Sequence, residues 1–287
     1  MAEEIEVTTV DEVPIPDDVP RLGGMPMLGY GTWRLSDPEE CVEAVSTAID
    51  VGYRHLDTAQ MYGNETAIGD AIDRSHVDRD EIFLASKVWY DSLAYEDAIE
   101  TAYRSLDRLG TDYLDLLYVH WPAGEYDPET TLDAFDQLVE EGVTERIGVS
   151  NFEPDQLTEA CERTSAPVFA NQFECHPLLG QRRLREACGD HDVYPVAYAP
   201  LARTEVMGIP AVADVAAKHD RSPAQVSLAW LRQKGITAIP KATGDHIHEN
   251  WQSLTLRLDD ADVRKLDSID RIERQVDPSF GPWNRRQ

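Results

Sequence analysis

Short apolar runs alternate with amphipathic, helix-like stretches along almost the whole chain, and this alternation restricts the fold more than any other feature. The run 114–119, Leu-Asp-Leu-Leu-Tyr-Val, is almost continuously apolar, which is typical of a parallel strand covered on both faces. Eight strands are predicted, at Met27–Tyr30, Arg54–Leu56, Ile82–Ser86, Leu114–Val119, Ile147–Val149, Val168–Ala170, Tyr194–Ala197 and Thr237–Ile239.

Helix patterns fill the intervals between these strands. Asp37-Pro38 and Ser222-Pro223 each give a cap followed by a proline in the first turn, and Gly110 and Gly142 mark helix ends. Helices are expected at Asp37–Asp50, Ala94–Leu109, Thr131–Glu141, Pro154–Arg163, Gln181–Cys188, Pro210–His219, Ser222–Gln233 and Asp245–Leu254. Eight strands alternating with about eight helices predict a (β/α)8 TIM barrel with extra helices; a doubly wound open sheet is the competing arrangement.

The series of strands and helices is continuous enough for one domain. At roughly 150 residues per domain, 287 residues would suffice for two, but a barrel of about 250 residues uses nearly the same length. No repeat or low-complexity segment interrupts the pattern. We expect a single barrel domain over residues 21–287, preceded by an acidic, proline-dotted arm or edge hairpin at residues 1–20.

Charge restricts the partners and the setting. With 26 Lys+Arg against 54 Asp+Glu, the net charge is −28, which repels phosphate backbones and anionic membrane surfaces, so neither nucleic acid nor membrane is expected as a partner. Only five of the cations are lysines. Such excess carboxylate is tolerated best in strong salt, where the Debye length falls to about 3 Å at 1 M, and it predicts a halophilic origin.

Further sequence features indicate a cytoplasmic protein, and a monomer is favoured. The N-terminal residues lack the apolar core of a signal peptide, and no apolar stretch is long enough to span a membrane. The cysteines have neither zinc-ligand spacing nor the density of a disulfide framework, so we expect reduced thiols and no metal site; they are Cys41, Cys161, Cys175 and Cys188.

Polar and aromatic residues recur where the predicted strands end, and in a barrel this is the end that carries the chemistry. Each residue alone could be a cap or a satisfied core residue. Together they predict a shared pocket, since two of only five lysines, Lys87 and Lys241, fall at strand ends. The other residues in this position are Asp57, Tyr62, His120, Trp121, Ser150, Asn151, Gln172 and Tyr198.

Four of these residues form a proton-donor set. The phenol of Tyr62, with an ordinary pKa of about 10, needs a nearby cation to give up its proton easily, and Lys87 is the candidate. Asp57 would keep Lys87 charged and oriented, and His120 could hydrogen-bond a substrate carbonyl. Reduction of a carbonyl also needs a hydride, which no side chain supplies, so a nicotinamide cofactor is implied. Gly29-Tyr-Gly31-Thr-Trp-Arg34 is no GxGxxG fingerprint, so a Rossmann mode of binding is not expected.

Several motifs resemble those of the aldo-keto reductases, whose fold is the (β/α)8 barrel. The segment 52–65, Gly-Tyr-Arg-His-Leu-Asp-Thr-Ala-Gln-Met-Tyr-Gly-Asn-Glu, is similar to the first signature of that family. Leu114–Pro122, Ile147–Phe152 and Ile239–Lys241 are similar to three others, and the resemblance runs from about Leu22 to Pro278. It implies reduction of aldehydes or ketones by NADPH, with Tyr62 as general acid assisted by Lys87, Asp57 and His120.

The resemblance also implies cofactor and substrate residues. Ser150, Asn151 and Gln172 match positions that hold the nicotinamide carboxamide, and Tyr198 matches the aromatic residue that stacks on the ring. Further cofactor contacts are expected at Gly31, Thr32, Asp57, Ala199, Leu201, Lys241, Ala242, Thr243, His246, Glu249 and Asn250. Trp33, Trp89 and Trp121 match pocket walls, and the tail could add Phe280 or Trp283.

The adenosine end departs from the family pattern. His246 stands where an arginine is expected at the 2′-phosphate, and the segment 241–250 is one residue shorter than in many relatives. NADPH is favoured, with NADH as a possible cofactor. The loops after the fourth and seventh strands are short, which favours an open pocket for small aldehydes, sugars or diketo acids. Two other functions remain open: a cofactor-binding regulatory module, and a Schiff-base lyase or aldolase that uses Lys87.

Overall fold

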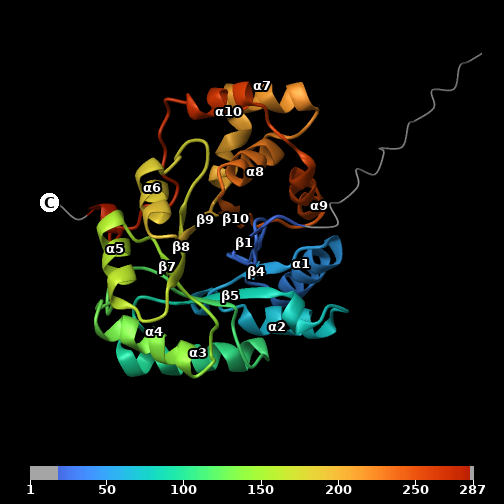
Figure 1. Cartoon of the computed structure of the whole chain (residues 1–287). Helices are drawn as coiled ribbons and strands as arrows, with labels where there is room; N and C mark the ends of the chain where they lie inside the picture. Colours follow the sequence, from blue (N-terminus) through green and yellow to red (C-terminus); the bar gives the residue numbers. More distant parts are fainter. Residues whose placement is uncertain (1–18, 285–287) are drawn as a thin grey trace, which may run out of the picture.

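Eight parallel strands form a closed barrel in the computed structural model, which describes residues 19–284 (Figure 1). The strands are β3 (Tyr30–Gly31), β4 (His55–Asp57), β5 (Phe83–Val88), β6 (Leu116–Val119), β7 (Ile147–Ser150), β8 (Val168–Glu174), β9 (Tyr194–Tyr198) and β10 (Thr237–Ala238). Each pairs in parallel with the next along the chain. The ring closes where Leu28 pairs with Ala238, so the open doubly wound sheet is excluded.

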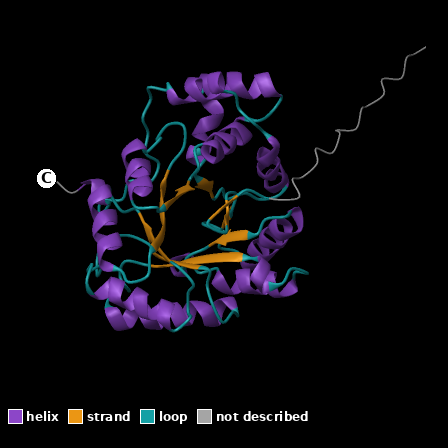
Figure 2. Cartoon of the chain, viewed as in Figure 1, coloured by secondary structure: helices purple, strands orange, loops and turns teal. Residues whose placement is uncertain are grey.

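Ten α-helices surround these strands in the described part of the chain (Figure 2). Eight were expected, and the caps Asp37 and Ser222 hold the starts of two of them as predicted. The helices are α1 (Pro38–Val51), α2 (Glu65–Arg74), α3 (Tyr95–Leu109), α4 (Thr130–Glu140), α5 (Pro154–Arg163), α6 (Arg182–Asp190), α7 (Pro210–His219), α8 (Pro223–Gln233), α9 (Asp245–Gln252) and α10 (Asp260–Asp267).

The helices α2 and α10 were not predicted. Gly69 lies in the middle of α2, where glycine lowers helix propensity, and its pattern therefore does not stand out in the sequence. In the fold, this glycine lets α2 approach the end of α3, because a Cβ at this position would lie 2.4 Å from the backbone oxygen of Leu109. The tertiary contact explains a residue that the local pattern disfavours.

An antiparallel hairpin, β1 (Arg21–Leu22) and β2 (Met25–Pro26), covers the N-terminal ends of the strands. Its Gly23 packs against Phe169 and Tyr194, near the starts of β8 and β9, and its Met25 is fully buried in the apolar cluster that fills the barrel. The predicted arm at residues 1–20 lies almost entirely outside the described residues. The hairpin thus covers the N-terminal end of the barrel, whereas the C-terminal end is where a barrel of this type carries its site.

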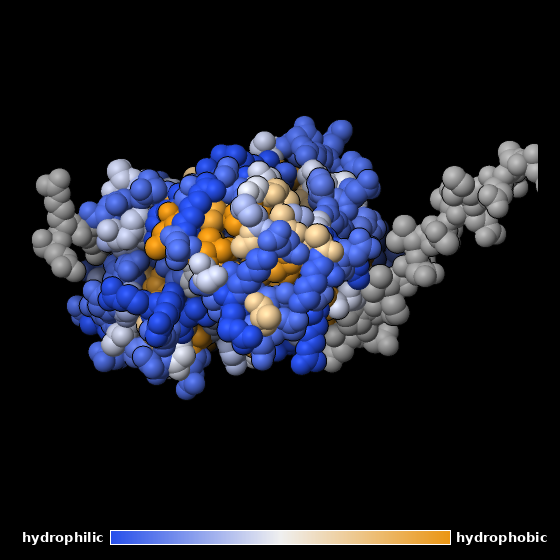
Figure 3. Space-filling model, turned by 90° about the horizontal axis from the view of Figure 1, so that it is seen from above, coloured by the Kyte–Doolittle hydropathy of each residue, from blue (hydrophilic) through white to orange (hydrophobic). Residues whose placement is uncertain are grey.

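On the face shown in Figure 3 most exposed residues are hydrophilic, and hydrophobic residues emerge only in a limited area. Of the cysteines, Cys41, Cys175 and Cys188 are buried and Cys161 is partly so, all as free thiols. Within residues 19–284, the helices are too short or too polar to cross a membrane.

Candidate active site

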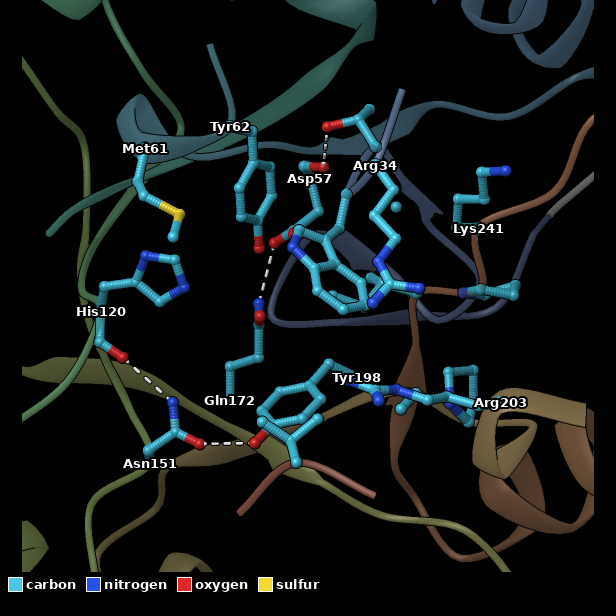
Figure 4. A pocket seen from close by; sticks show the side chains of 18 of the residues that line it. Arg34, Asp57, Met61, Tyr62, His120, Asn151, Gln172, Tyr198, Arg203 and Lys241 are labelled. Carbon is cyan, nitrogen blue, oxygen red and sulfur yellow. Dashed lines mark hydrogen bonds between the residues drawn. The ribbon is translucent and has the colours of Figure 1, made fainter. Parts of the chain in front are cut away.

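A cavity of about 490 Å³ opens at the C-terminal ends of the strands (Figure 4). Most of the residues predicted for the site line it. They are Gly31, Thr32, Trp33, Asp57, Tyr62, Trp89, His120, Trp121, Asn151, Gln172, Tyr198, Ala199, Leu201, Lys241 and Phe280. Parallel strands end on the same side of the barrel, and this brings together residues from β3 to β10.

Asp57 and Lys87 form a buried ion pair at the base of the cavity. Asp57 ends β4, and Lys87 lies on the neighbouring strand β5. The Lys87 Nζ donates to Asp57 Oδ1 at 2.5 Å and to the backbone oxygen of Thr58 at 2.7 Å. The second carboxylate oxygen of Asp57 accepts from Gln172 Nε2 at 2.8 Å. Lys87 is therefore held behind Asp57 and does not line the cavity, which gives no support to a Schiff-base role.

Tyr62 stands between this ion pair and His120. It ends the short helix η1 (Gln60–Tyr62) that follows β4, its ring centroid lies 5.3 Å from Lys87 Nζ, and its ring meets the His120 ring edge-on at 5.8 Å. In Figure 4, Tyr62 and His120 face the same space. The structure thus brings together all four residues of the predicted proton-donor set.

The predicted direction of the Tyr62 pKa is wrong for this arrangement. We expected Lys87 to lower it, but burial of the phenol, followed by the nearby negative charge of Asp57 and the interaction with the Tyr198 phenol, raises the pKa of Tyr62 well above its usual value. Burial also lowers the pKa of Lys87, while Asp57 opposes that change. Desolvation outweighs the cation because the ion pair is nearly neutral as a whole. The phenol therefore retains its proton, as a group that donates one must.

His120 is a buried, neutral imidazole. Burial, assisted by the positive charge of Lys87, holds the pKa of His120 well below its usual value. Its Nδ1 has no hydrogen-bond partner among the described residues, and the Trp89 ring packs edge-on against it at 4.8 Å. A neutral imidazole facing a cavity can hydrogen-bond a carbonyl without bringing a fixed charge.

The ring of Tyr198 and the carboxamides of Asn151 and Gln172 line another part of the cavity. Tyr198 at the end of β9 donates its hydroxyl to Asn151 Oδ1 at 2.7 Å, and Asn151 Nδ2 donates to the His120 backbone oxygen at 3.0 Å. Ser150 Oγ donates to the backbone oxygen of Gln172 at 2.9 Å, which joins the ends of β7 and β8. Tyr198, Asn151 and Gln172 line this part of the cavity and offer a ring face and two carboxamides to a flat ring that bears an amide, such as a nicotinamide.

The opposite side of the cavity carries cations. Lys241 is exposed and makes no ion pair with the described residues, although the chain has an excess of carboxylates. Arg34 and Arg203, which the sequence reasoning missed, also line the cavity here, and their guanidinium carbons lie 4.3 Å and 5.3 Å from the centroid of the Trp33 ring. Figure 4 shows Lys241 and Arg203 on the side away from His120. Cations left unpaired beside a cleft fit the phosphates of a dinucleotide.

Six residues predicted for the cofactor do not line the cavity. Of these, His246 is exposed on α9 and its Nδ1 lies 2.8 Å from Glu249 Oε2. Tyr30 donates its hydroxyl to the Ala242 backbone oxygen at 2.5 Å, which attaches the segment after β10 to the barrel. The remaining residues of this set lie with them on or just before α9, except for Ser150 at the end of β7; the set is Ser150, Ala242, Thr243, His246, Glu249 and Asn250.

Aromatic side chains form the outer wall. The Phe280 ring meets Trp121 at 5.2 Å and Trp89 at 6.3 Å, and the Trp283 ring lies tilted against Trp121 at 5.7 Å without lining the cavity. Other lining residues were missed because they have no chemical signature in the sequence; they are Met61, Pro200, Thr204, Ile239, Pro240, Val276 and Pro278.

The model of the aldo/keto reductase family matches residues 27–271. The chain belongs to the aldo/keto reductase family. A 9,11-endoperoxide prostaglandin H2 reductase of Trypanosoma cruzi (strain CL Brener) is 41% identical over 254 residues, 87% of this chain and 89% of that protein. A glyoxal reductase of Bacillus subtilis (strain 168) is 37% identical over 251 residues, 87% and 91% of the two chains.

A solved aldo-keto reductase complexed with NADPH has the same fold, with a TM-score of 0.84 and 32% sequence identity over 92% of this chain and 91% of that one. As a member of the aldo/keto reductase family, the chain is an oxidoreductase with a (β/α)8 barrel, as its sequence motifs predicted.

Proposed function

We propose that this aldo/keto reductase reduces small aldehydes and ketones to alcohols with NADPH and uses Tyr62 as the general acid. The observation that carries the proposal is the meeting of Tyr62, His120 and the Lys87–Asp57 ion pair at one cavity beside Tyr198 and Gln172. A relative that is 37% identical is named a glyoxal reductase, and a solved relative holds NADPH, which supports both halves of the proposal.

NADPH, when bound, would supply the hydride that the reduction of the carbonyl carbon requires. The Tyr62 hydroxyl and the His120 imidazole hydrogen-bond the carbonyl oxygen and stabilise the negative charge that develops on it. Tyr62 then gives its proton to this oxygen, which completes the alcohol, and Lys87 stabilises the phenolate that remains. Asp57 holds the Lys87 ammonium in place through the 2.5 Å hydrogen bond.

The nicotinamide end of the cofactor would lie against Tyr198, with its carboxamide on Ser150, Asn151 and Gln172. Lys241 and Thr243 would meet the phosphates, with contacts from Gly31, Thr32, Asp57, Ala199, Leu201, Ala242, Glu249 and Asn250 elsewhere. His246 offers less to a 2′-phosphate than an arginine, because an imidazole lacks the planar fork of N–H donors with which a guanidinium binds a phosphate bidentately. We propose NADPH as the preferred cofactor, with measurable use of NADH.

The aromatic wall of Trp33, Trp89, Trp121 and Phe280 would contact the substrate beyond its carbonyl group. We propose a broad range of small carbonyls, sugars or diketo acids as substrates. We also propose that the protein acts as a cytoplasmic monomer in strong salt without a nucleic-acid or membrane partner, a setting that the net charge of −28 favours.

The test is fluorescence titration of the purified protein with NADPH and with NADH in high KCl, followed by the absorbance of the reduced nicotinamide in the presence of simple aldehydes. Binding with aldehyde-dependent oxidation, tighter for NADPH, supports the proposal. Binding without oxidation by any carbonyl would instead favour a regulatory module. Failure to bind either cofactor would refute the proposal.

A further inference from the structure

A segment without regular structure covers one side of the cavity. Residues 269–284, here called the C-terminal tail, follow α10 and contain only the short helix η5 (Pro282–Asn284). Three of its residues, Val276, Pro278 and Phe280, line the cavity. Neither a helix nor a strand fixes the course of the tail before η5, so specific contacts must hold these residues in place.

Glu174 provides one such contact. This residue ends β8, and its carboxylate is fully buried. Its Oε1 accepts from the backbone N–H of Gln275 at 2.5 Å, and its Oε2 accepts from the N–H of Val276 at 2.9 Å. Two consecutive amides of the tail thus each bind one oxygen of a single carboxylate. Hydrogen bonds to an ionised acceptor are about twice as strong as those between neutral groups.

Because Glu174 is buried, breaking its hydrogen bonds to the tail would be energetically costly. The third partner of the carboxylate is His176 Nε2, which lies 2.9 Å from Oε1. If the tail moved away, a carboxylate buried in the barrel would lose two of its three partners, and uncompensated buried charge is costly. The buried charge of Glu174 therefore holds the tail against the end of β8. This place is next to Tyr198, because Glu174 and Tyr198 are paired in the β8–β9 register.

Beyond this point the tail is internally braced. Trp283 Nε1 donates to Asp277 Oδ1 at 2.7 Å, and the Arg274 guanidinium carbon lies 3.7 Å from the centroid of the Trp283 ring. This braced turn carries Phe280, whose ring also meets Tyr90 at 4.7 Å. Fixing the amides of residues 275 and 276 therefore fixes the position of Phe280 over the cavity.

We propose that Glu174 is a positioning residue that sets substrate selectivity by holding the C-terminal tail. It contacts neither carbonyl nor cofactor in the proposed mechanism. It keeps Phe280 against Trp121, so that a carbonyl with a flat apolar substituent gains a contact that a small dicarbonyl does not need. This inference rests on the proposed reductase function for its kinetic part and on the geometry of the tail alone for its structural part.

The kinetic test compares benzaldehyde with glyoxal, both with NADPH. Glu174→Gln replaces one acceptor oxygen by an N–H donor that faces a backbone N–H. We expect kcat/KM for benzaldehyde to fall about tenfold, mainly through KM, while that for glyoxal and the NADPH Kd change less than about twofold. Phe280→Ala should lower the ratio of kcat/KM for benzaldehyde to kcat/KM for glyoxal to the same extent. The double variant Glu174→Gln/Phe280→Ala should lower this ratio no further.

Two further variants complete the kinetic test. Glu174→Asp keeps the charge but is too short to reach both amides, and it should act in the same direction if Glu174→Gln fails to fold. Glu273→Gln changes a tail carboxylate that pairs with Arg271, and it is the matched control that should leave the ratio unchanged. Additive effects of Glu174→Gln and Phe280→Ala, or an unchanged ratio in either Glu174 variant, would overturn the proposal.

Hydrogen exchange tests the anchor without any activity. The amides of Gln275 and Val276 should be protected in the wild-type protein and should exchange at least about tenfold faster in Glu174→Gln or Glu174→Asp, with no change at Leu117 in the barrel. Equal exchange in the wild type and in these variants would refute the anchor. If no carbonyl is reduced at all, the proposed function and the kinetic part of this inference fail, and the exchange rates still decide whether Glu174 anchors the tail.

Discussion

The carboxylate of Asp57 lies between Lys87 and Gln172 and hydrogen-bonds both, at 2.5 Å and 2.8 Å. Asp57 and Gln172 are 115 residues apart in the sequence, so this link exists only because β4 and β8 end on the same side of one closed barrel. It connects the predicted proton-donor residues with a residue predicted to hold the nicotinamide. Both halves of the proposed reaction therefore depend on one buried carboxylate.

Removal of that carboxylate should destabilise the protein. Asp57→Ala leaves the ammonium of Lys87 buried without its partner, and breaking a buried pair in this way costs about 3–5 kcal/mol. The free energy of unfolding, measured with urea, should fall by this amount. Asp70→Ala, which breaks the exposed pair with Arg74, is the control and should cost less than about 1 kcal/mol. Similar costs at the two positions would contradict a buried ion pair.

Tyr62→Phe should abolish most of the turnover and leave cofactor binding intact. The variant keeps the ring that packs against His120 and removes only the proton to be donated. We expect kcat to fall roughly 10²–10⁴-fold, with the NADPH Kd within about threefold of the wild type. Stopped-flow oxidation of NADPH and fluorescence titration measure the two quantities. A large loss of NADPH affinity would mean that Tyr62 has a structural role instead.

Lys87→Met should resemble Tyr62→Phe in kcat, whereas Lys87→Arg should retain part of the activity because it keeps a cation beside the phenol. Single-turnover kinetics at saturating NADPH separates the chemical step from product release. Equal turnover in the wild type and in both Lys87 variants would end the proton-donor mechanism.

The cofactor ratio should respond to His246. His246→Arg places a guanidinium where the resemblance to the family implies an arginine, and we expect the NADPH:NADH ratio of kcat/KM to rise about tenfold. His248→Arg adds the same charge to α9 two residues away and serves as the matched control. A rise of equal size in the control would indicate a general field effect rather than a 2′-phosphate contact.

Acid should destabilise the fold through His55. This residue is buried at the start of β4, and burial lowers its pKa to about 4 from 6.5. The unfolded chain binds a proton near pH 6.5 and the folded chain only near pH 4. His55 therefore removes about 3 kcal/mol of stability as the pH falls through this interval, while above pH 6.5 the full stability remains.

Urea unfolding at a series of pH values measures this effect. His55→Gln should flatten the dependence on pH between 6.5 and 4 by about 3 kcal/mol relative to the wild type. His248→Gln, on the exposed side of α9, is the control and should keep the wild-type slope. An identical slope in His55→Gln and the wild type would exclude His55 as the source.

High salt should stabilise the protein. A net charge of −28 makes the folded chain repel itself, and KCl at 2 M screens this repulsion almost completely. Thermal unfolding between 0.1 and 2 M KCl should show a rising midpoint. A midpoint independent of KCl would remove the halophilic interpretation.

Local patterns were sufficient for most of the fold. The Asp37-Pro38 and Ser222-Pro223 pairs predicted helix starts because a cap and a proline act through bonds within one turn, and both caps are present. The same patterns failed for α2, where Gly69 is explained only by its contact with Leu109 on α3. Strand β8 also extends to Glu174, beyond its predicted end, and Glu174 anchors a tail that is distant in the sequence.

The sequence by itself determined the order of strands and helices and the chemistry available at the strand ends, including Tyr62, Lys87 and His120. Periodicity, caps and side-chain type are local properties, and they can be recognised in the sequence without knowledge of the fold. Only the tertiary structure decided the pKa direction of Tyr62, the pairing of Asp57 with Gln172 and the course of the tail past Glu174. Desolvation and contacts between distant residues arise when the barrel closes, and no local pattern encodes them.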